Sequence, residues 1–343
     1  MGFGNFLYSL IHTIEPLEFI SHWNRYSEIS KNYRLIVSSE KYNKRVVYPP
    51  GLTDILNQNN TDFVPYFKSK NIFSLDTNII NSMMGNSGVQ ILYDHSIMLD
   101  TNYTSYIKRF LSEKNPNLLE ESTYKTLDIL LRNKFNYDTT FYLLENYMNL
   151  FSSGEKVFTV TNTKHLAVFE NLYYVELFKS INQEKYIEYS KVEYTISENE
   201  AKQNTDDLIS LFYNGSSKEI LRMFINMHQS MTLLLIGIWQ IQFSSKVSAK
   251  NKMKKLFDYV TSKVGVFYER EMVIALKYFE DTKSVSMLNK INKGGKSFNQ
   301  KELLEKVENI AWDFIVPRVM EFQINANKNY SNFIPFFYHT IKN

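Results

Sequence analysis

Two copies of the tetrapeptide Leu-Asp-Thr-Asn, at Leu75–Asn78 and Leu99–Asn102, contain the first side chains with a capacity for chemistry. Each copy follows a short apolar run typical of a strand, and a strand delivers its last residue to the sheet edge where α/β proteins bind ligands. An Asp there is a hard oxygen ligand for Mg²⁺ or Mn²⁺, and the adjacent Thr or Asn can orient it. The structural alternative is a helix cap, because these residue types are common at any strand-to-helix turn.

The second copy is the better candidate for a ligand site. Asp100 is followed by apolar residues at helical spacing from Tyr103 to Leu111, which predicts an amphipathic helix. Asp76 is followed by NIINSMMGNSG, which predicts a helix of only about two turns. We therefore expect Asp100 to be a metal ligand assisted by Asn102, and we keep Asp76 as the reserve.

A second carboxylate stands in the apolar helical segment FYLLENYMNL. Glu145 has Phe141, Leu144 and Met148 as its neighbours at positions i−4, i−1 and i+3. A carboxylate on or beside a buried stripe is costly unless it is paired or bound to a metal. Glu145 is thus a second candidate ligand, and the alternative is a Glu at the rim of the core that pairs with a Lys.

A third carboxylate lies inside the apolar segment NIAWDFIVPRVMEF. Asp313 has apolar residues on both sides, and Pro317 cannot donate a hydrogen bond to the Asp313 carbonyl four residues earlier. This predicts a helix with a kink beside a buried Asp, which suits a ligand site. The alternative is an ion pair between Asp313 and Arg318 or a Lys.

The composition restricts the kind of metal. The chain has 343 residues, no Cys and six His, and the His residues show no metal-binding spacing. Thiolate zinc sites, Cys nucleophiles and iron–sulfur clusters are therefore excluded, and a catalytic metal would need oxygen ligands. The net charge of +3 comes from a Lys-rich composition of the kind that AT-rich coding produces, so it is no evidence for a nucleic-acid partner.

Strands and helices must position these carboxylates. Strands are predicted at Asn71–Leu75, in VQILYD and SIMLD after a turn at Gly85–Gly88, and at Val157–Val160. Helices are predicted at Tyr103–Leu111, Glu121–Asn133, Thr139–Phe151, Gln300–Asn325 and over most of the chain from Lys164 onward. Asp138 stands near the start of one helix, where the helix dipole favours an acid. The pattern predicts a helix-rich α/β protein.

The sequence strand–Asp-Thr-Asn–helix resembles the first motif of PIN-domain nucleases, which include the toxin ribonucleases of toxin–antitoxin pairs. The resemblance implies a Rossmann-like core sheet with helices on both faces and acidic residues gathered at the sheet edge. It further implies that Asp100, Glu145 and Asp313 hold Mg²⁺ or Mn²⁺ and activate water for attack on RNA. The Ala-Trp-Asp segment around Asp313, with Arg318 downstream, resembles a late acidic motif of large bacterial PIN-like proteins.

Two features depart from the PIN pattern. Lys342 stands where a terminal Thr-x-Asp motif starting at Thr340 would have its Asp, so a fourth acid is absent or comes from Asp76, Asp94 or Asp281. The acids also span more chain than a usual PIN domain, which requires a helical insertion. We predict an N-terminal segment packed on the core at 1–62, a PIN-like core at 63–160 and 300–343, and a helical insertion at 161–299.

Arg222 and His228 support a different catalytic hypothesis. Their spacing in LRMFINMHQS resembles the signature of HEPN ribonucleases, helical enzymes that use no metal. The Arg would stabilise phosphate charge and the His would act as acid or base. Positions six apart lie about 240° around a helix, however, so the two side chains do not share a face. The structural alternative is a half-buried His and a surface Arg.

Two clusters of lysines are candidate contacts for RNA phosphates. They are Lys246–Lys255 and Lys290–Lys301. Binding of phosphates by these side chains would depend on salt. The alternative is two solvated faces, which a Lys-rich chain also produces.

The leading hypothesis is a metal-dependent endoribonuclease, acting as a bacterial toxin or phage-defence effector with an antitoxin or a phage-derived trigger protein as partner. The alternative is a non-catalytic binding or regulatory protein of such a system, and the HEPN-like ribonuclease is a second alternative. We expect a cytoplasmic protein with no membrane partner, since the N-terminus does not resemble a signal peptide. The most apolar stretch, Met231–Ile241, is eleven residues long, and a membrane-spanning helix needs about 20.

Overall fold

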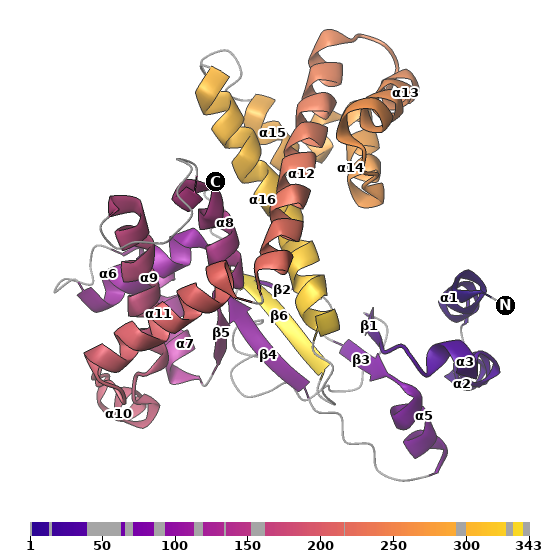
Figure 1. Ribbon diagram of the computed structural model, residues 1–343. Helices are drawn as coiled ribbons and strands as arrows, with labels where there is room; N and C mark the ends of the chain where they lie inside the picture. The colour runs from indigo at the N-terminus through magenta and orange to yellow at the C-terminus, as the bar shows by residue number, and fades with distance from the viewer. Residues whose placement is uncertain are drawn as a thin grey trace. The chain divides into compact units, whose positions relative to one another are not determined.

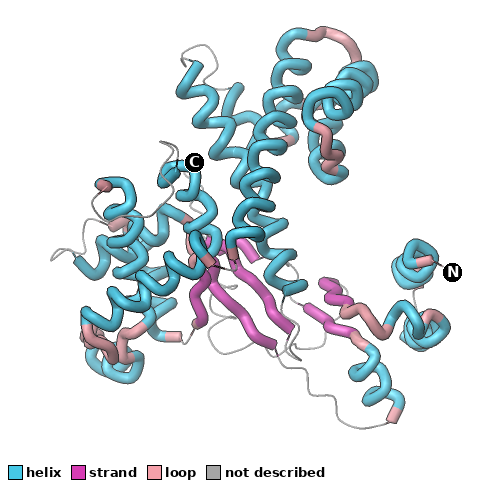
Figure 2. The backbone as a smooth tube through the Cα atoms, viewed as in Figure 1, coloured by secondary structure: helices cyan, strands magenta, loops and turns pink. Residues whose placement is uncertain are grey.

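The structure is a computed structural model that describes residues 2–13, 16–39, 63–65, 71–85, 93–112, 119–133, 135–151, 162–215, 217–292, 300–326 and 332–338. Helices predominate, and two small sheets account for the strands (Figures 1 and 2). The chain is therefore a helix-rich α/β protein, as its sequence predicts. It divides into two compact units, the first comprising 1–97, 120–137 and 323–343, and the second 98–119 and 138–322.

The first unit contains both sheets and five helices among its described residues. The helices are α1 (Phe3–Ile11), α2 (Pro16–Arg25), α3 (Ser27–Ser30), α5 (Thr77–Met84) and α7 (Glu121–Arg132). The strands are β1 (Leu35–Ser39), β2 (Phe63–Pro65), β3 (Asn71–Leu75), β4 (Tyr93–Met98), β5 (Asn136–Asp138) and β6 (Asn332–Tyr338). Strands β1 and β3 pair antiparallel, and the second sheet has the order β2-β6-β4-β5. The last residues of β4 and β5 already belong to the second unit.

A small aromatic core holds the N-terminal helices of the first unit together. Phe6, Leu10, Trp23 and Ile80 are its buried members, and the indole of Trp23 also donates a hydrogen bond of 3.3 Å to the Thr77 hydroxyl. Because Thr77 and Ile80 lie on α5, this core links the helix after β3 to α1 and α2.

The second unit is made of helices, and the last residues of its final helix, α16, already belong to the first unit. Its helices are α6 (Thr101–Ser112), α8 (Thr140–Phe151), α9 (Thr163–Lys179), α10 (Gln183–Tyr189), α11 (Glu198–Asn214), α12 (Lys218–Ser244), α13 (Ala249–Tyr259), a π-helix (Val260–Val264), α14 (Glu269–Glu280), a short 3-10 helix (Thr282–Ser284), α15 (Ser286–Asn292) and α16 (Gln300–Ala326). The predicted helix after Asp100 is confirmed as α6, which buries Tyr103 and Ile107 against neighbouring helices. Helix α6 packs on α8 and α9, and α9 packs on α11.

The two longest helices meet through aromatic side chains. The ring of His228 on α12 stacks on Trp312 of α16 with 4.2 Å between the ring centroids, and Phe224 packs edge-on against Phe322. Helix α16 continues through Pro317. Among the described residues, no helix is both long enough and apolar enough to cross a membrane.

Some sequence predictions concern residues outside the described part of the chain. They are the strand at Val157–Val160, most of the lysine-rich loop before Gln300, and the terminal positions Thr340 and Lys342. The predicted helical insertion concerns the relation between a core and its inserted helices. The division into two compact units does not show which helices are inserted into which core, so the boundaries 63–160, 161–299 and 300–343 stay a prediction.

Candidate active site

Both Leu-Asp-Thr-Asn segments form the same local structure, a strand that ends at an Asp which caps the next helix. Asp76 follows β3 and accepts a hydrogen bond of 2.9 Å from the Ile79 amide at the start of α5. Asp100 follows β4 and accepts one of 2.7 Å from the Tyr103 amide at the start of α6. The capping alternative thus holds for both residues, and any further role depends on their surroundings.

Asp76 lies in an ordinary surface environment of the first unit. Its side chain is 21% exposed, and its Oδ2 stands 3.6 Å from Nε of Arg34 in an ion pair. A capping acid with a guanidinium beside it has its charge compensated. Asp76 therefore needs no metal to explain its position.

Asp100 lies in the second unit and is only 3% exposed. Helix α8 places Glu145 against the same turn, where its Oε2 accepts hydrogen bonds from the Thr101 amide at 3.0 Å and the Thr101 hydroxyl at 2.8 Å. The residue directly after Asp100 thus holds the second predicted carboxylate. In the described part of the chain neither Asp100 nor Glu145 has an ion pair with Lys or Arg.

Asn146 is a member of this site that the sequence interpretation missed. Its Nδ2 donates to the Thr101 hydroxyl at 3.0 Å and to the Tyr142 carbonyl at 2.8 Å. Because the Thr101 hydroxyl donates its single hydrogen to Glu145, it can accept from Asn146 at the same time. The available signal was a second polar residue next to Glu145 in an otherwise apolar helix.

Asp313 is placed by α16 and has a cation beside it. Its Oδ2 lies 3.1 Å from Nζ of Lys290, and its side chain is 21% exposed. The predicted alternative of an ion pair with a Lys is therefore realised, although the negative charge of Asp313 still acts on Asp100 and Glu145. The structure thus brings the three predicted carboxylates within electrostatic range of one another.

The carboxylates of Asp100 and Glu145 both hold protons unusually well. Burial raises the pKa of Asp100 to about 6, against hydrogen bonds from Tyr103 and Asn102 that favour the charged form. Burial and the neighbouring charge of Asp100 raise the pKa of Glu145 to about 8, against the two hydrogen bonds from Thr101. At neutral pH Glu145 therefore keeps its proton while Asp100 is mostly ionised, and a cation could take the place of that proton.

The donor set suits a hard cation, although the side chains do not form a closed metal cage. Carboxylate oxygens and the exposed amide of Asn102 are the ligand types that Mg²⁺ and Mn²⁺ prefer, and the chain has no Cys to supply a thiolate. Within the described residues, no three His, Asp or Glu side chains stand together as a group that could hold a metal ion. Metal binding at Asp100 and Glu145 would thus rely on water or substrate oxygens as further ligands.

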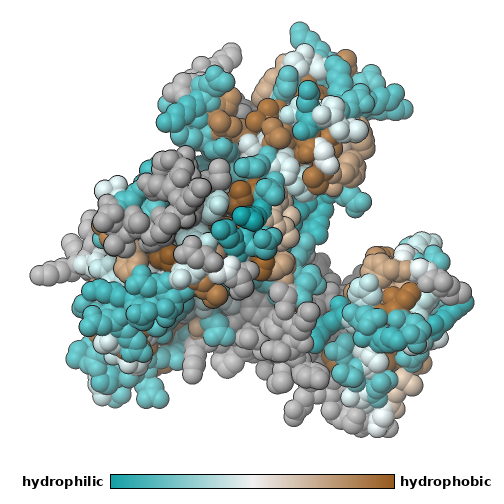
Figure 3. Space-filling view, in the orientation of Figure 1, coloured by the Kyte–Doolittle hydropathy of each residue, from teal (hydrophilic) through white to brown (hydrophobic). Residues whose placement is uncertain are grey.

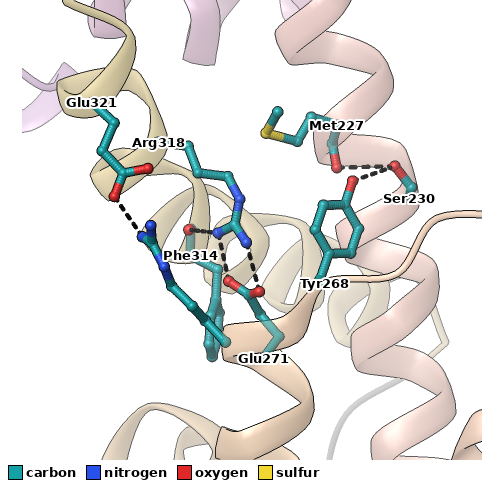
Figure 4. A network of polar contacts seen from close by, with 8 residues as sticks. Met227, Ser230, Tyr268, Glu271, Phe314, Arg318 and Glu321 are labelled. Carbon is teal, nitrogen blue, oxygen red and sulfur yellow. Dashed lines mark hydrogen bonds and ion pairs between the residues drawn. The ribbon is translucent and has the colours of Figure 1, made fainter. Parts of the chain in front are cut away.

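Arg318 takes part in a different network from the one predicted. Its guanidinium binds both carboxylate oxygens of buried Glu271, with nitrogen–oxygen distances of 2.5 and 2.6 Å, and lies over the ring of Tyr268 (Figure 4). Arg270 and Glu321 form a second ion pair, at 2.6 Å, between α14 and α16. The ion pair of Arg318 therefore joins two helices, and of the two partners considered for Asp313, Arg318 or a Lys, the structure has the Lys, Lys290.

Arg222 and His228 do not share an environment. Arg222 is exposed and its guanidinium lies 3.4 Å from Glu219, whereas His228 is buried and its Nε2 lies 2.9 Å from the Glu308 carbonyl. Burial lowers the pKa of His228, which disfavours its charged form. The arrangement matches the structural alternative, a buried His and a surface Arg.

The remaining acids have structural roles or lack a described side chain. Asp138 accepts hydrogen bonds from the amide and the hydroxyl of Thr140 at the start of α8, as the sequence predicts for a helix start. Asp281 caps the short 3-10 helix through the Lys283 amide. The side chain of Asp94 is outside the described part of the structure. The described geometry therefore supplies no fourth acid for the site.

The comparisons with known proteins found no match for this chain. No family model matches this sequence, and no curated protein or solved structure was found to be similar to it.

Proposed function

We propose that the protein is a metal-dependent endoribonuclease whose active site contains Asp100 and Glu145. The observation that carries the proposal is the pair of hydrogen bonds by which Thr101, directly after Asp100, holds Glu145 from another helix. Two carboxylates in one buried site repel each other unless a cation compensates them. Part of the same proposal is a PIN-like core, for which the support is the strand–Asp-Thr-Asn–helix segment.

The chain's own residues would divide the work at this site. Asp100 and Glu145 would hold Mg²⁺ or Mn²⁺, with Asp313 acting on the metal by its charge. Thr101 orients Glu145, and Asn146 fixes the Thr101 hydroxyl in the direction that this requires. When bound, the metal would activate a water and neutralise charge on the scissile phosphate.

RNA as the substrate rests on the resemblance to PIN-domain nucleases. The same resemblance supports a role as a bacterial toxin or phage-defence effector with an antitoxin or phage-derived trigger as partner. Such an effector would act in the cytoplasm.

A non-catalytic binding or regulatory protein is the second candidate function. Two observations favour it: Asp313 is already paired with Lys290, and the described residues contain no closed group of three metal ligands. In that case the Asp100–Glu145 pair would share a proton and would serve only the fold.

The deciding experiment measures Mn²⁺ binding and RNA cleavage together. We expect the wild-type protein to bind Mn²⁺ in calorimetry and to cleave mixed RNA in Mn²⁺ but not in EDTA. Glu145→Gln should lose both properties, because an amide is a weaker ligand and brings no charge. Glu170→Gln is the matched control, since Glu170 pairs with Lys108 on the partly exposed contact between α6 and α9.

Two results would decide against a metal-dependent enzyme. Cleavage that EDTA leaves unchanged would contradict the requirement for a metal. A protein that neither binds Mn²⁺ nor cleaves RNA would leave the non-catalytic binding or regulatory protein as the remaining candidate.

A further inference from the structure

An exposed surface at the far end of α12–α14 combines lysines with phenylalanine rings. We define this basic–aromatic surface as Lys250, Lys254 and Phe257 on α13 together with Phe267 before α14. Its residues all belong to the second unit, and none takes part in the carboxylate site. In Figure 3, hydrophobic and hydrophilic areas lie side by side over this end of the molecule, at the top of the view.

Helix α13 presents these side chains because its other face is buried. Lys252, Leu256 and Val260 are buried, whereas Lys250, Lys254 and Phe257 are exposed and lie within about 60° of one another around the helix. The amine of Lys252 donates to Gln242 at 2.9 Å, and that of Lys255 to Ser245 at 3.0 Å. Two lysines of α13 thus fasten it to the end of α12, whereas Lys250 and Lys254 face solvent.

A close contact between α12 and the end of α13 sets the position of the surface. Tyr259 packs on Gly237, where a Cβ atom would lie 2.3 Å from the Tyr259 ring, and its hydroxyl donates to the Leu233 carbonyl at 3.1 Å. The π-helix follows directly, and Gly265, with φ of 74°, lets the chain turn back. Only a residue without a side chain at position 237 allows this approach.

Phe267 is fixed by its buried neighbour. Tyr268 bonds to Ser230 of α12 through its hydroxyl at 2.9 Å, and Arg318 lies over its ring, as Figure 4 shows. With Tyr268 anchored on one side of the extended chain, Phe267 is directed outward. Its ring stacks on Phe257 with 5.5 Å between centroids and 20° between planes.

The charge on this surface is positive and uncompensated. Residues 246–263 contain six lysines and one acid, Asp258. In the described part of the chain neither Lys250 nor Lys254 forms an ion pair, although other exposed lysines such as Lys185 do. Two neighbouring ammonium groups without a carboxylate partner favour a polyanion.

The exposed phenylalanine rings narrow the class of polyanion that this surface can bind. Phe257 is 46% exposed and Phe267 is 50% exposed, so a stacked aromatic pair stands in water beside the ammonium groups. Unpaired bases stack on such rings while the backbone phosphates meet lysines, whereas the bases of a duplex are already stacked on each other. A purely basic face would not distinguish these two forms of nucleic acid.

We propose that the basic–aromatic surface binds single-stranded nucleic acid, with phosphates at Lys250 and Lys254 and bases on Phe257 and Phe267. Binding here does not require cleavage. Only the choice of RNA as the first probe rests on the proposed function, and single-stranded DNA of the same sequence is the second probe.

Fluorescence anisotropy with labelled oligonucleotides in EDTA tests the surface. Lys250→Ala/Lys254→Ala should weaken binding of single-stranded RNA and make the slope of log affinity against log salt less negative by about 1.4, the value for two phosphate contacts. Phe257→Ala/Phe267→Ala should weaken it about tenfold with the slope unchanged. The control Lys164→Ala/Lys218→Ala removes two exposed lysines elsewhere in the second unit and should bind like the wild type.

Asp100→Asn separates this proposal from the proposed function. If that variant binds RNA in EDTA like the wild type and neither protein cleaves RNA in Mn²⁺, the surface stands and the ribonuclease does not. Equal loss in the control and the Lys250/Lys254 variant, duplex binding as tight as single-strand binding, or no binding of either probe would overturn the proposal.

Discussion

The two Leu-Asp-Thr-Asn segments are locally alike and differ in what surrounds them. Asp76 and Asp100 each follow a strand, cap a helix and accept a hydrogen bond from the amide three residues ahead. Asp76 then meets the guanidinium of Arg34, whereas Asp100 is buried beside Glu145, a second acid. The Asp of the same tetrapeptide thus has a cation beside it in the first unit. In the second unit it lies near another acid and, among the described residues, has no ion pair with Lys or Arg. The difference arises from the neighbouring elements, and it marks Asp100 as the residue to test.

The largest expected effect comes from replacing each Asp of the two segments by Asn. Asp100→Asn should lower Mn²⁺-dependent RNA cleavage by about 100-fold or more, since it removes a ligand rather than a supporting side chain. Asp76→Asn should leave cleavage unchanged. Both amides keep the capping oxygen, so melting temperatures should confirm that both variants fold. Equal activity of the two variants would end the distinction between the segments.

The pH dependence of stability without metal should reveal the same difference. Because the pKa values of Asp100 and Glu145 are raised to about 6 and about 8, the folded state binds more protons than the unfolded chain. The contribution of this pair to stability is then fully present below about pH 4 and is lost as pH rises from about 4 to about 8. Each tenfold change in proton affinity corresponds to about 1.4 kcal/mol, so the loss is on the order of a few kcal/mol.

This loss is measured as a fall in melting temperature in EDTA, and Mn²⁺ should oppose it at the upper end of the range. Glu145→Gln should flatten the dependence, because it removes the group with the higher pKa. A wild-type melting temperature that does not fall between these pH values would show that the carboxylates are compensated in another way.

The threonines that follow the two acids form a further matched pair. Thr101→Val removes the hydroxyl that donates to Glu145, and we expect Mn²⁺ affinity in calorimetry to fall about tenfold. Thr77→Val should leave it unchanged, since the Thr77 hydroxyl accepts only from Trp23 in the first unit. Thr101→Ser should restore the affinity. A Ser variant as weak as the Val variant would mean that packing of the methyl group, and not the hydrogen bond, is responsible.

The smallest effect concerns Asp76 itself. Asp76→Ala removes the cap of α5 and should cost about 1 kcal/mol in urea unfolding. Asp76→Asn keeps the cap and loses only a partly exposed ion pair, which contributes at most about 1 kcal/mol. An Asn variant as unstable as the Ala variant would show that the pairing with Arg34 matters more than the cap.

Local parts of the structure were predictable because they depend on neighbouring residues. The helix from Thr101 follows from apolar spacing and an Asp at its start, and the short α5 follows from the Gly-rich sequence after Met84. The partner of Arg318 could not be predicted because Glu271, the carboxylate that it binds, is 47 positions away in the sequence. Asn146 was missed because the sequence around it does not indicate that its amide bonds to Thr101, 45 positions away.

The sequence by itself determined the helix-rich character, the two strand–Asp–helix junctions and the exclusion of thiol chemistry, since periodicity, capping and composition are local properties. Only the tertiary structure decided which junction is buried with a second acid. That outcome depends on α8 bringing Glu145 across 44 positions to Thr101, and on Lys290 and Arg34 compensating Asp313 and Asp76. Long-range packing sets the local charge balance, and the charge balance sets whether a capping Asp is free to do chemistry.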